Sequence, residues 1–248
     1  VFHCGSYGVQ IKPTFNVGEL YLCDHLITYG EGWEDWTARH FPAMHNYANA
    51  KLYGGYFPAA QKLYSGRKIS APSPNARLMY VPTTLRGADA RYGPFEDYED
   101  VLYENWWRNL REIFGSQMII KLHPKSRRQA NILEPTLTGH LEDCISKSDT
   151  FIFDYVSTAF SLVAATDKAI IFLDTGLQNF DEKALEAIKR RTVYFDLKNG
   201  MPPKYSVICA KAASKSYSYD YSVNHSGITS DKSCTEQLIN CLKSVIYD

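Results

Sequence analysis

From about residue 77 onwards, short apolar stretches alternate with segments of helical periodicity, and this alternation constrains the fold more than any other feature of the sequence. Strands that are apolar along their whole length are typical of a parallel sheet covered by helices on both faces. We therefore predict an α/β fold with a Rossmann-like parallel sheet. Strands are expected at Arg77–Thr83, Gln117–Leu122, Thr150–Asp154, Ala169–Leu173 and Val193–Leu197.

The segments between these strands carry apolar residues at helical spacing. Helices are expected at Phe95–Phe114, Leu141–Lys147, Ser157–Ala165, Phe180–Arg191 and Asp231–Ile246. The first 76 residues differ, because they are rich in Gly, Tyr and Trp and contain only two short apolar runs, Leu20–Tyr29 and Ala50–Tyr53. Pro72–Asn75 has the composition of a linker. The chain therefore divides into residues 1–76 and residues 77–248.

Composition excludes several classes of protein. The 248 residues include 27 Lys plus Arg and 27 Asp plus Glu, so the formal net charge is zero, whereas a dedicated nucleic-acid binder usually has a basic excess. No stretch approaches the 18 or so apolar residues of a membrane span, and Val1–Gly30 lacks the pattern of a signal peptide. The six cysteines are scattered, which favours reduced thiols in a cytosolic protein over disulfides or zinc. The spacing of the histidines assigns no metal site.

Ligands of open parallel sheets bind beyond the carboxyl ends of the strands. His123 lies at such a position, followed by Pro124 and then by basic residues that begin with Lys125. A histidine there can donate a hydrogen bond or a proton to a phosphate oxygen. The nearby positive charge suits an anion. The same residues would also fit a solvated basic turn with an incidental histidine.

Three other segments have comparable chemistry. Ser157 and Thr158 lie between a predicted strand and a predicted helix, where they could bind a phosphate or simply cap the helix. Thr83 and Arg86 follow another predicted strand and suit phosphate contacts, although an ordinary turn would look the same. His3 begins a glycine-rich segment and is a candidate base, with a frayed terminus as the alternative.

The order of these motifs resembles that of the two-domain GT-B glycosyltransferase-like enzymes that build bacterial surface polymers. Teichoic-acid glycerophosphotransferases and capsule polymerases are the nearest members, and sialyl- and Kdo-transferases are more distant. The matching segments are His3-Cys4-Gly5 followed by Lys12, Leu26–Gly30, Leu52–Gly55, Tyr80–Thr83 with Arg86, Lys121–Pro124, Asp149–Thr158, Ala169–Phe172 and Asn224–Ile228.

This resemblance implies a metal-independent transferase that needs no cofactor and uses a CMP- or CDP-linked donor. The acceptor would be a glycan or a lipid-linked acceptor in the synthesis of a capsule or another surface polysaccharide. His123 would protonate the leaving phosphate, and His3 would deprotonate the acceptor hydroxyl across an interdomain cleft. The residues expected to bind the donor are Thr83, Arg86, Lys121, Lys125, Ser157 and Thr158.

A two-domain transferase of this kind normally needs more chain than 248 residues. Residues 77–248 are expected to form a nearly complete C-terminal nucleotide-binding domain, and residues 1–76 the last part of an acceptor-side domain. The first residue is Val, which agrees with a missing front. The expected location is the cytoplasm, at the inner membrane face if the missing part adds a peripheral contact. The alternatives are a non-catalytic nucleotide- or glycan-binding module and a nucleotide-sugar epimerase of the same fold.

Overall fold

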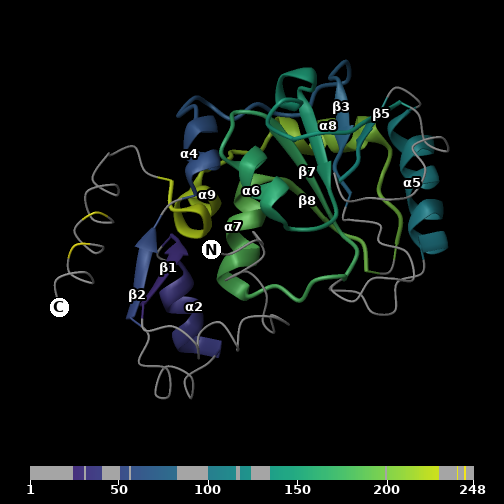
Figure 1. The fold of residues 1–248 in the computed structure, drawn as a ribbon. Helices are drawn as coiled ribbons and strands as arrows, with labels where there is room; N and C mark the ends of the chain where they lie inside the picture. The colour runs from purple at the N-terminus through teal and green to yellow at the C-terminus, as the bar shows by residue number, and fades with distance from the viewer. Residues whose placement is uncertain are drawn as a thin grey trace.

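A computed structural model describes residues 25–30, 32–40, 51–55, 57–82, 100–115, 118–123, 135–198 and 200–228, with the single positions 239 and 243. A six-stranded parallel sheet forms its centre (Figure 1). The strands of this sheet are β3 (Leu78–Tyr80), β4 (Ile119–Lys121), β5 (Thr136–Leu137), β6 (Thr150–Phe153), β7 (Ala169–Asp174) and β8 (Val193–Asp196).

The strand order in this sheet is β5-β4-β3-β6-β7-β8. The chain therefore starts at β3, runs outwards to β5, and then returns to the other side of β3 before it runs outwards to β8. Met79 shows the reversal directly, since it pairs with Ile119 on one side and with Phe151 on the other. This is the order of doubly wound dinucleotide-binding folds, whose ligands bind where the order reverses. The prediction of an α/β, Rossmann-like fold is confirmed.

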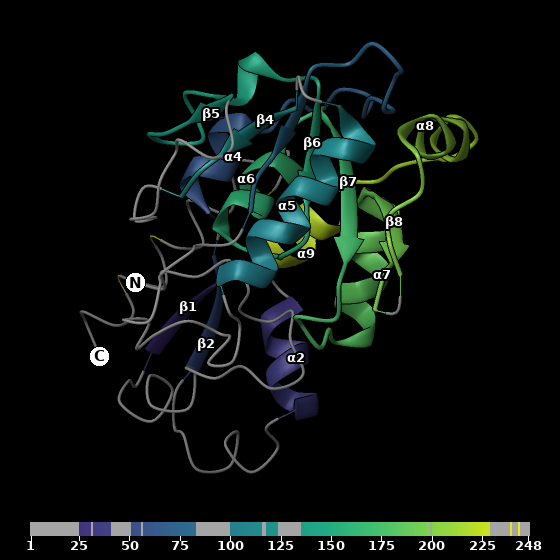
Figure 2. The same cartoon turned by 90° about the vertical axis from the view of Figure 1, so that its right-hand side faces the viewer.

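Successive residues of the strands enter two different cores, as the two faces of a pleated sheet require. Phe151, Phe153 and Phe172 belong to one core, and Ile152 and Ile171 belong to the other. The first core is covered by α4 (Pro58–Leu63), α6 (Thr158–Ala164), α7 (Glu182–Arg191) and α9 (Asp220–Ser226). The second is covered by α5 (Asp100–Phe114) and α8 (Tyr205–Ala213). Figure 1 shows α6 and α7 to one side of the sheet and α5 to the other, and in Figure 2 α5 lies in front of the sheet.

A smaller parallel pair lies below this domain in Figure 1, where β1 (His25–Tyr29) is paired with β2 (Lys51–Gly55) and joined to α2 (Gly32–His40). The carboxyl ends of the pair meet α9. A Cβ atom on Gly30 would lie 2.4 Å from the carbonyl oxygen of Asn224, and Gly30 has a φ of +84°. Only glycine can occupy that position, both for its backbone angle and for the close approach. The small sheet is thus held directly against the larger domain.

The predicted strands are confirmed, although most are shorter than the apolar stretches that indicated them. Helix α6 begins directly after Ser157, as expected, whereas Leu141–Lys147 is largely a turn that ends in the 3₁₀ helix η3 (Ile145–Lys147). Helices α2, α4, α8 and α9 were not predicted. The expected helix at Asp231–Ile246 lies outside the described residues, apart from Ile239 and Lys243. The domain division at residue 76 stays a prediction, although α4, which precedes it, contacts α6.

A buried cation, Arg191, joins the end of α7 to the end of α6. Arg191 ends α7 with a solvent exposure of 0%, and its guanidinium donates to the carbonyl oxygens of Ala164 (2.8 Å), Thr166 (2.9 Å) and Lys168 (3.0 Å). These carbonyls end α6 and begin the approach to β7, where helical hydrogen bonds are no longer available. Burial lowers the pKa of Arg191 to about 10, so the side chain remains a cation at neutral pH.

We predict that Arg191→Ala lowers the free energy of unfolding by at least about 3 kcal/mol, because several buried carbonyls lose their donor at about 1–3 kcal/mol each. Urea denaturation measures this change. Arg190→Ala is the matched control, since Arg190 is exposed and pairs with Asp220 at the surface, so its loss should cost less than about 1 kcal/mol. Equal effects of the two substitutions would contradict the assignment.

Candidate functional site

The predicted site residues follow strands that are neighbours in the sheet. His123 comes after β4 and is exposed, while Ser157 and Thr158 come after β6 and are half-buried. Between β4 and β6 lies β3, which leads to Thr83 and Arg86. Two strand spacings separate the ends of β4 and β6 by about 10 Å, a gap that side chains from both strands can reach across.

Four of the predicted residues lie outside the described part of the chain, and their roles stay predictions. These residues are His3, Thr83, Arg86 and Lys125.

Lys121 is described, and its surroundings differ from those expected of a phosphate ligand. The side chain is buried, and its ammonium donates to the carbonyl oxygens of Leu122 (2.7 Å) and Gly139 (2.8 Å). Burial lowers the pKa of this ammonium. These contacts join β4 to the segment after β5 and favour a structural role for Lys121 over donor binding.

Asp154 begins the turn after β6 and is buried at the point where the strand order reverses. Its Oδ2 accepts hydrogen bonds from the Tyr80 hydroxyl (2.5 Å) and from the Trp106 indole N–H (3.0 Å). The two donors come from β3 and α5. Because buried polar groups keep their hydrogen bonds, this carboxylate fixes the start of the turn relative to β3 and α5.

The next part of the turn is held by Gln178 from the segment after β7. The Val156 backbone N–H donates to Gln178 Oε1 (2.6 Å), and Gln178 Nε2 donates to the Val156 carbonyl (3.1 Å). Ser157 then occupies the N-cap position of α6, with φ −139° and ψ −177°, but in this turn its hydroxyl makes no capping hydrogen bond. The structure therefore does not support plain capping as the role of that hydroxyl.

Asp174 anchors the end of β7 in a similar way. Its Oδ1 accepts from the Gly176 N–H (2.9 Å), and its Oδ2 accepts from the Tyr194 hydroxyl of β8 (2.5 Å). Burial and the contact with Asp174 raise the pKa of Tyr194, so the phenol stays protonated as the donor. The segments that follow β6 and β7 are thus both fixed by buried polar contacts.

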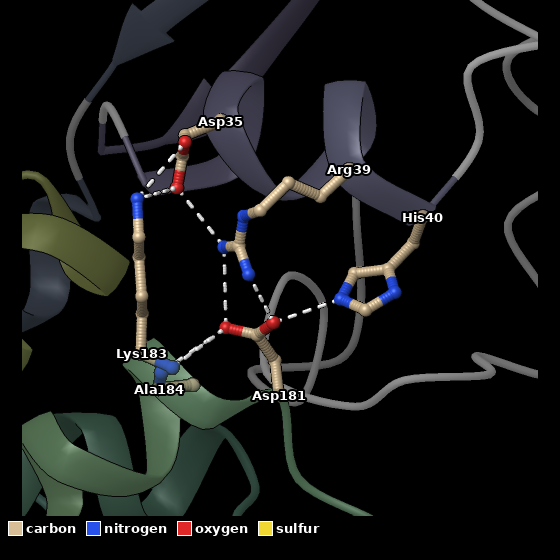
Figure 3. A network of polar contacts seen from close by, with 6 residues as sticks. All are labelled: Asp35, Arg39, His40, Asp181, Lys183 and Ala184. Atoms are coloured by element: carbon tan, nitrogen blue, oxygen red, sulfur yellow. Dashed lines mark hydrogen bonds and ion pairs between the residues drawn. The ribbon is translucent and has the colours of Figure 1, made fainter.

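The segment after β7 ends at Asp181, where the larger domain meets α2 (Figure 3). This carboxylate caps α7 by accepting from the N–H groups of Lys183 (3.1 Å) and Ala184 (3.2 Å). It also accepts from both terminal nitrogens of Arg39 and lies 2.8 Å from His40 Nε2. Burial raises the pKa of Asp181, but these hydrogen bonds outweigh burial and hold it at about 2.

A second carboxylate extends this network towards the surface. Asp35 lies 2.9 Å from Arg39 Nη2 and 3.0 Å from Lys183 Nζ. The hydrogen bond from Lys183 does most to lower its pKa. We call the five residues Asp35, Arg39, His40, Asp181 and Lys183 the α2–α7 network, because they join α2 to the start of α7 (Figure 3).

His225 is buried beside this network on α9. Its Nδ1 finds no hydrogen-bond partner among the described residues, and its Cε1 would lie 3.3 Å from a Cβ atom on Gly32. The pKa of His225 is lowered to about 4, mainly by burial, with the charge of Asp181 opposing the shift and that of Arg39 adding to it. The imidazole is therefore neutral at physiological pH.

Within the described ranges, no group of three His, Cys, Asp or Glu side chains is arranged to hold a metal ion. The helices of the same part of the chain include none with a stretch long and apolar enough to cross a bilayer.

Comparison of the chain with protein-family models, with curated proteins and with solved structures gives no match. The functional interpretation therefore depends on the geometry of the sheet edge and on the residues that line it.

Gln178 and Asp181 follow the predicted strand Ala169–Leu173, but the sequence alone did not assign a role to either residue. The sequence feature that could have indicated Gln178 and Asp181 is their position after a predicted strand, where ligands of parallel sheets bind. Their partners could not be read from the sequence, since Val156 is 22 positions from Gln178 and Arg39 is 142 positions from Asp181.

The lowered pKa of Asp181 predicts a stability difference that disappears in acid. An aspartate whose folded pKa lies below its unfolded value stabilises the fold above pH 4 and loses that contribution as the pH falls towards 2. Asp181→Asn keeps the helix cap, so it should reduce the free energy of unfolding by about 2 kcal/mol at pH 7 and much less near pH 2. Urea denaturation across this range measures it, and a difference independent of pH would contradict it.

His225 should act in a separate pH interval. Its folded pKa of about 4 lies below the usual 6.5, so the unfolded chain binds the proton first and stability falls as the pH drops from 6.5 to 4. We expect wild-type protein to lose about 3 kcal/mol more than His225→Gln over this interval. The exposed His140→Gln variant is the control and should follow wild type. Parallel curves for wild type and His225→Gln would refute the assignment.

Proposed function

We propose that this chain carries the donor-binding part of a metal-independent GT-B-type transferase. It would transfer a glycosyl or glycerophosphate group from a CMP- or CDP-linked donor to a glycan or lipid-linked acceptor during synthesis of a bacterial surface polysaccharide. The observation that carries this proposal is the placement of three predicted phosphate-binding segments after three adjacent strands, β4, β3 and β6, on the two sides of the reversal in strand order.

The arrangement of the two sheets gives further support. The carboxyl ends of β1 and β2 meet α9, through Gly30 and through a hydrogen bond from Phe57 N to Ser226 O of 2.9 Å. In Figure 2, β7 and β8 run towards α2. The resemblance to GT-B enzymes implies a site in a cleft between two domains, and this arrangement of the two sheets is compatible with such a cleft. Together these features favour a two-part site over a single-domain nucleotide binder.

In the proposed reaction, the donor phosphate lies between His123 and the hydroxyls of Ser157 and Thr158. The bond from the transferred group to the nucleotide oxygen breaks, and the nucleotide leaves with the electron pair. His123 donates a proton or a hydrogen bond to that oxygen, which lowers the cost of its developing charge. The acceptor oxygen forms the new bond, and its proton passes to His3. The buried contacts of Asp154 and Gln178 hold the turn that presents Ser157.

Calorimetry with CMP and CDP, with UDP as the comparison nucleotide, tests donor binding by the full chain. We expect CMP or CDP to bind and UDP to bind more weakly. A donor-consumption assay then separates the readings: a transferase releases one free nucleotide per turnover, an epimerase releases none in steady state, and a non-catalytic module binds without turnover. Binding of neither cytidine nucleotide would refute the proposed donor class.

His123→Ala should lower turnover by about 10²-fold or more, the usual scale for loss of a general acid. His140→Ala is the matched control, because His140 is also exposed but follows β5 at the outer edge of the sheet. Turnover close to wild type in a correctly folded His123→Ala protein would remove His123 from the mechanism.

A further inference from the structure

Gln178 is placed to control the geometry of the candidate donor turn. It is 3% exposed, and it pairs with both the N–H and the carbonyl of Val156, the residue directly before Ser157. Water competes poorly for hydrogen bonds at such a buried site. The position of the Ser157 and Thr158 hydroxyls therefore depends on where Gln178 is held.

The chain after Gln178 has little freedom to move. Phe180 is partly buried and packs against the first core, with its ring 5.8 Å from that of Phe172. Asp181 follows at once, 2% exposed and fixed by the first N–H groups of α7. Only Asn179 and Phe180 separate the two buried polar side chains, so a displacement of Asp181 has no flexible linker in which to be absorbed.

The position of Asp181 depends in turn on α2. A buried carboxylate needs hydrogen-bonding or cationic partners, and Arg39 supplies two hydrogen bonds to it while His40 supplies a third contact. Both residues belong to the helix beside the small parallel sheet (Figure 3). Removal of the guanidinium would leave Asp181 under-neutralised and would favour its movement towards water.

We infer that the segment Gln178–Asp181 couples the docking of α2 to the geometry of the Val156–Thr158 turn, with Gln178 as the positioning residue. Its role in catalysis rests on the proposed function, because that function makes the turn a donor site. The coupling itself does not depend on that function, because it is argued from the hydrogen bonds of Asp181 with Arg39 and of Gln178 with Val156. The small sheet and its helix would then regulate donor binding without touching the donor.

Hydrogen exchange of the Val156 amide, followed by NMR in the full chain without nucleotide, tests the coupling directly. Arg39→Met should speed exchange at Val156 by about tenfold, while amides of β7 such as Phe172 keep their protection. Arg39→Lys, which retains the charge, should restore most of the protection. Lys183→Met is the matched control, since it removes the other ion pair between α2 and α7 but leaves the Asp181 side chain paired.

A double variant provides the decisive comparison. If Arg39 acts through Gln178, Arg39→Met should add nothing to the exchange rate at Val156 once Gln178→Met is present. Unchanged exchange at Val156 in Arg39→Met would overturn the inference. So would an equal rise at Val156 and Phe172, which would indicate general destabilisation, or additive effects of the two substitutions.

The nucleotide measurements form a separate arm. Arg39→Met and Gln178→Met should weaken binding of CMP or CDP by similar factors, whereas Lys183→Met should bind like wild type. If wild-type protein binds neither nucleotide, the proposed function fails and the exchange experiment still decides the coupling. If nucleotide binds with equal affinity in all variants, the coupling does not regulate the donor site.

Discussion

A buried carboxylate needs cationic or hydrogen-bonding partners close to it. At Asp181 this requirement explains the contacts between α2 and the start of α7. The side chain caps α7, so it cannot be moved without loss of the helix start. Its remaining capacity is filled by Arg39 and His40 from α2. The position of α2 and of the small sheet beside it is thus linked to Asp181, which the N-terminus of α7 already holds in place.

Buried polar side chains also fix the backbone around the candidate site. Asp154, Asp174 and Gln178 are buried, and each takes hydrogen bonds that cross between neighbouring strands or their loops. The role described here for these three residues does not require any of them to touch a ligand. Their effect is to fix backbone segments at the reversal in strand order, so that groups presented to a ligand are placed before it arrives. Pre-organisation of this kind is what both tight anion binding and catalysis require.

Much of the fold could be predicted because continuous apolar strands leave few alternatives to a covered parallel sheet. The start of α6 was recognisable for a local reason, because Ser157 directly precedes an apolar helical segment and serine is favoured at that position. Helix α9 could not be found, since its environment is set by Gly30 and Asn224, which are far apart in the chain. Arg191 resembled a surface residue at the end of a charged helix, yet it is fully buried by carbonyls that only the folded chain brings together. Lys121 was expected to bind the donor, and its contacts with two backbone carbonyls could not be predicted, because Gly139 is 18 positions away.

The separation of Arg39 and Asp181 by 142 positions also bears on how the protein assembles during synthesis. Arg39 leaves the ribosome long before its partner exists, and α9, which contacts β1, is made later still. Contacts between such distant positions form slowly, because a long loop must close before they bring any gain. Helix α2, with Trp33 and Trp36 that end up buried, therefore waits with apolar surface exposed. Apolar surface that waits for distant partners is prone to aggregation during synthesis, which is the hazard that chaperones limit.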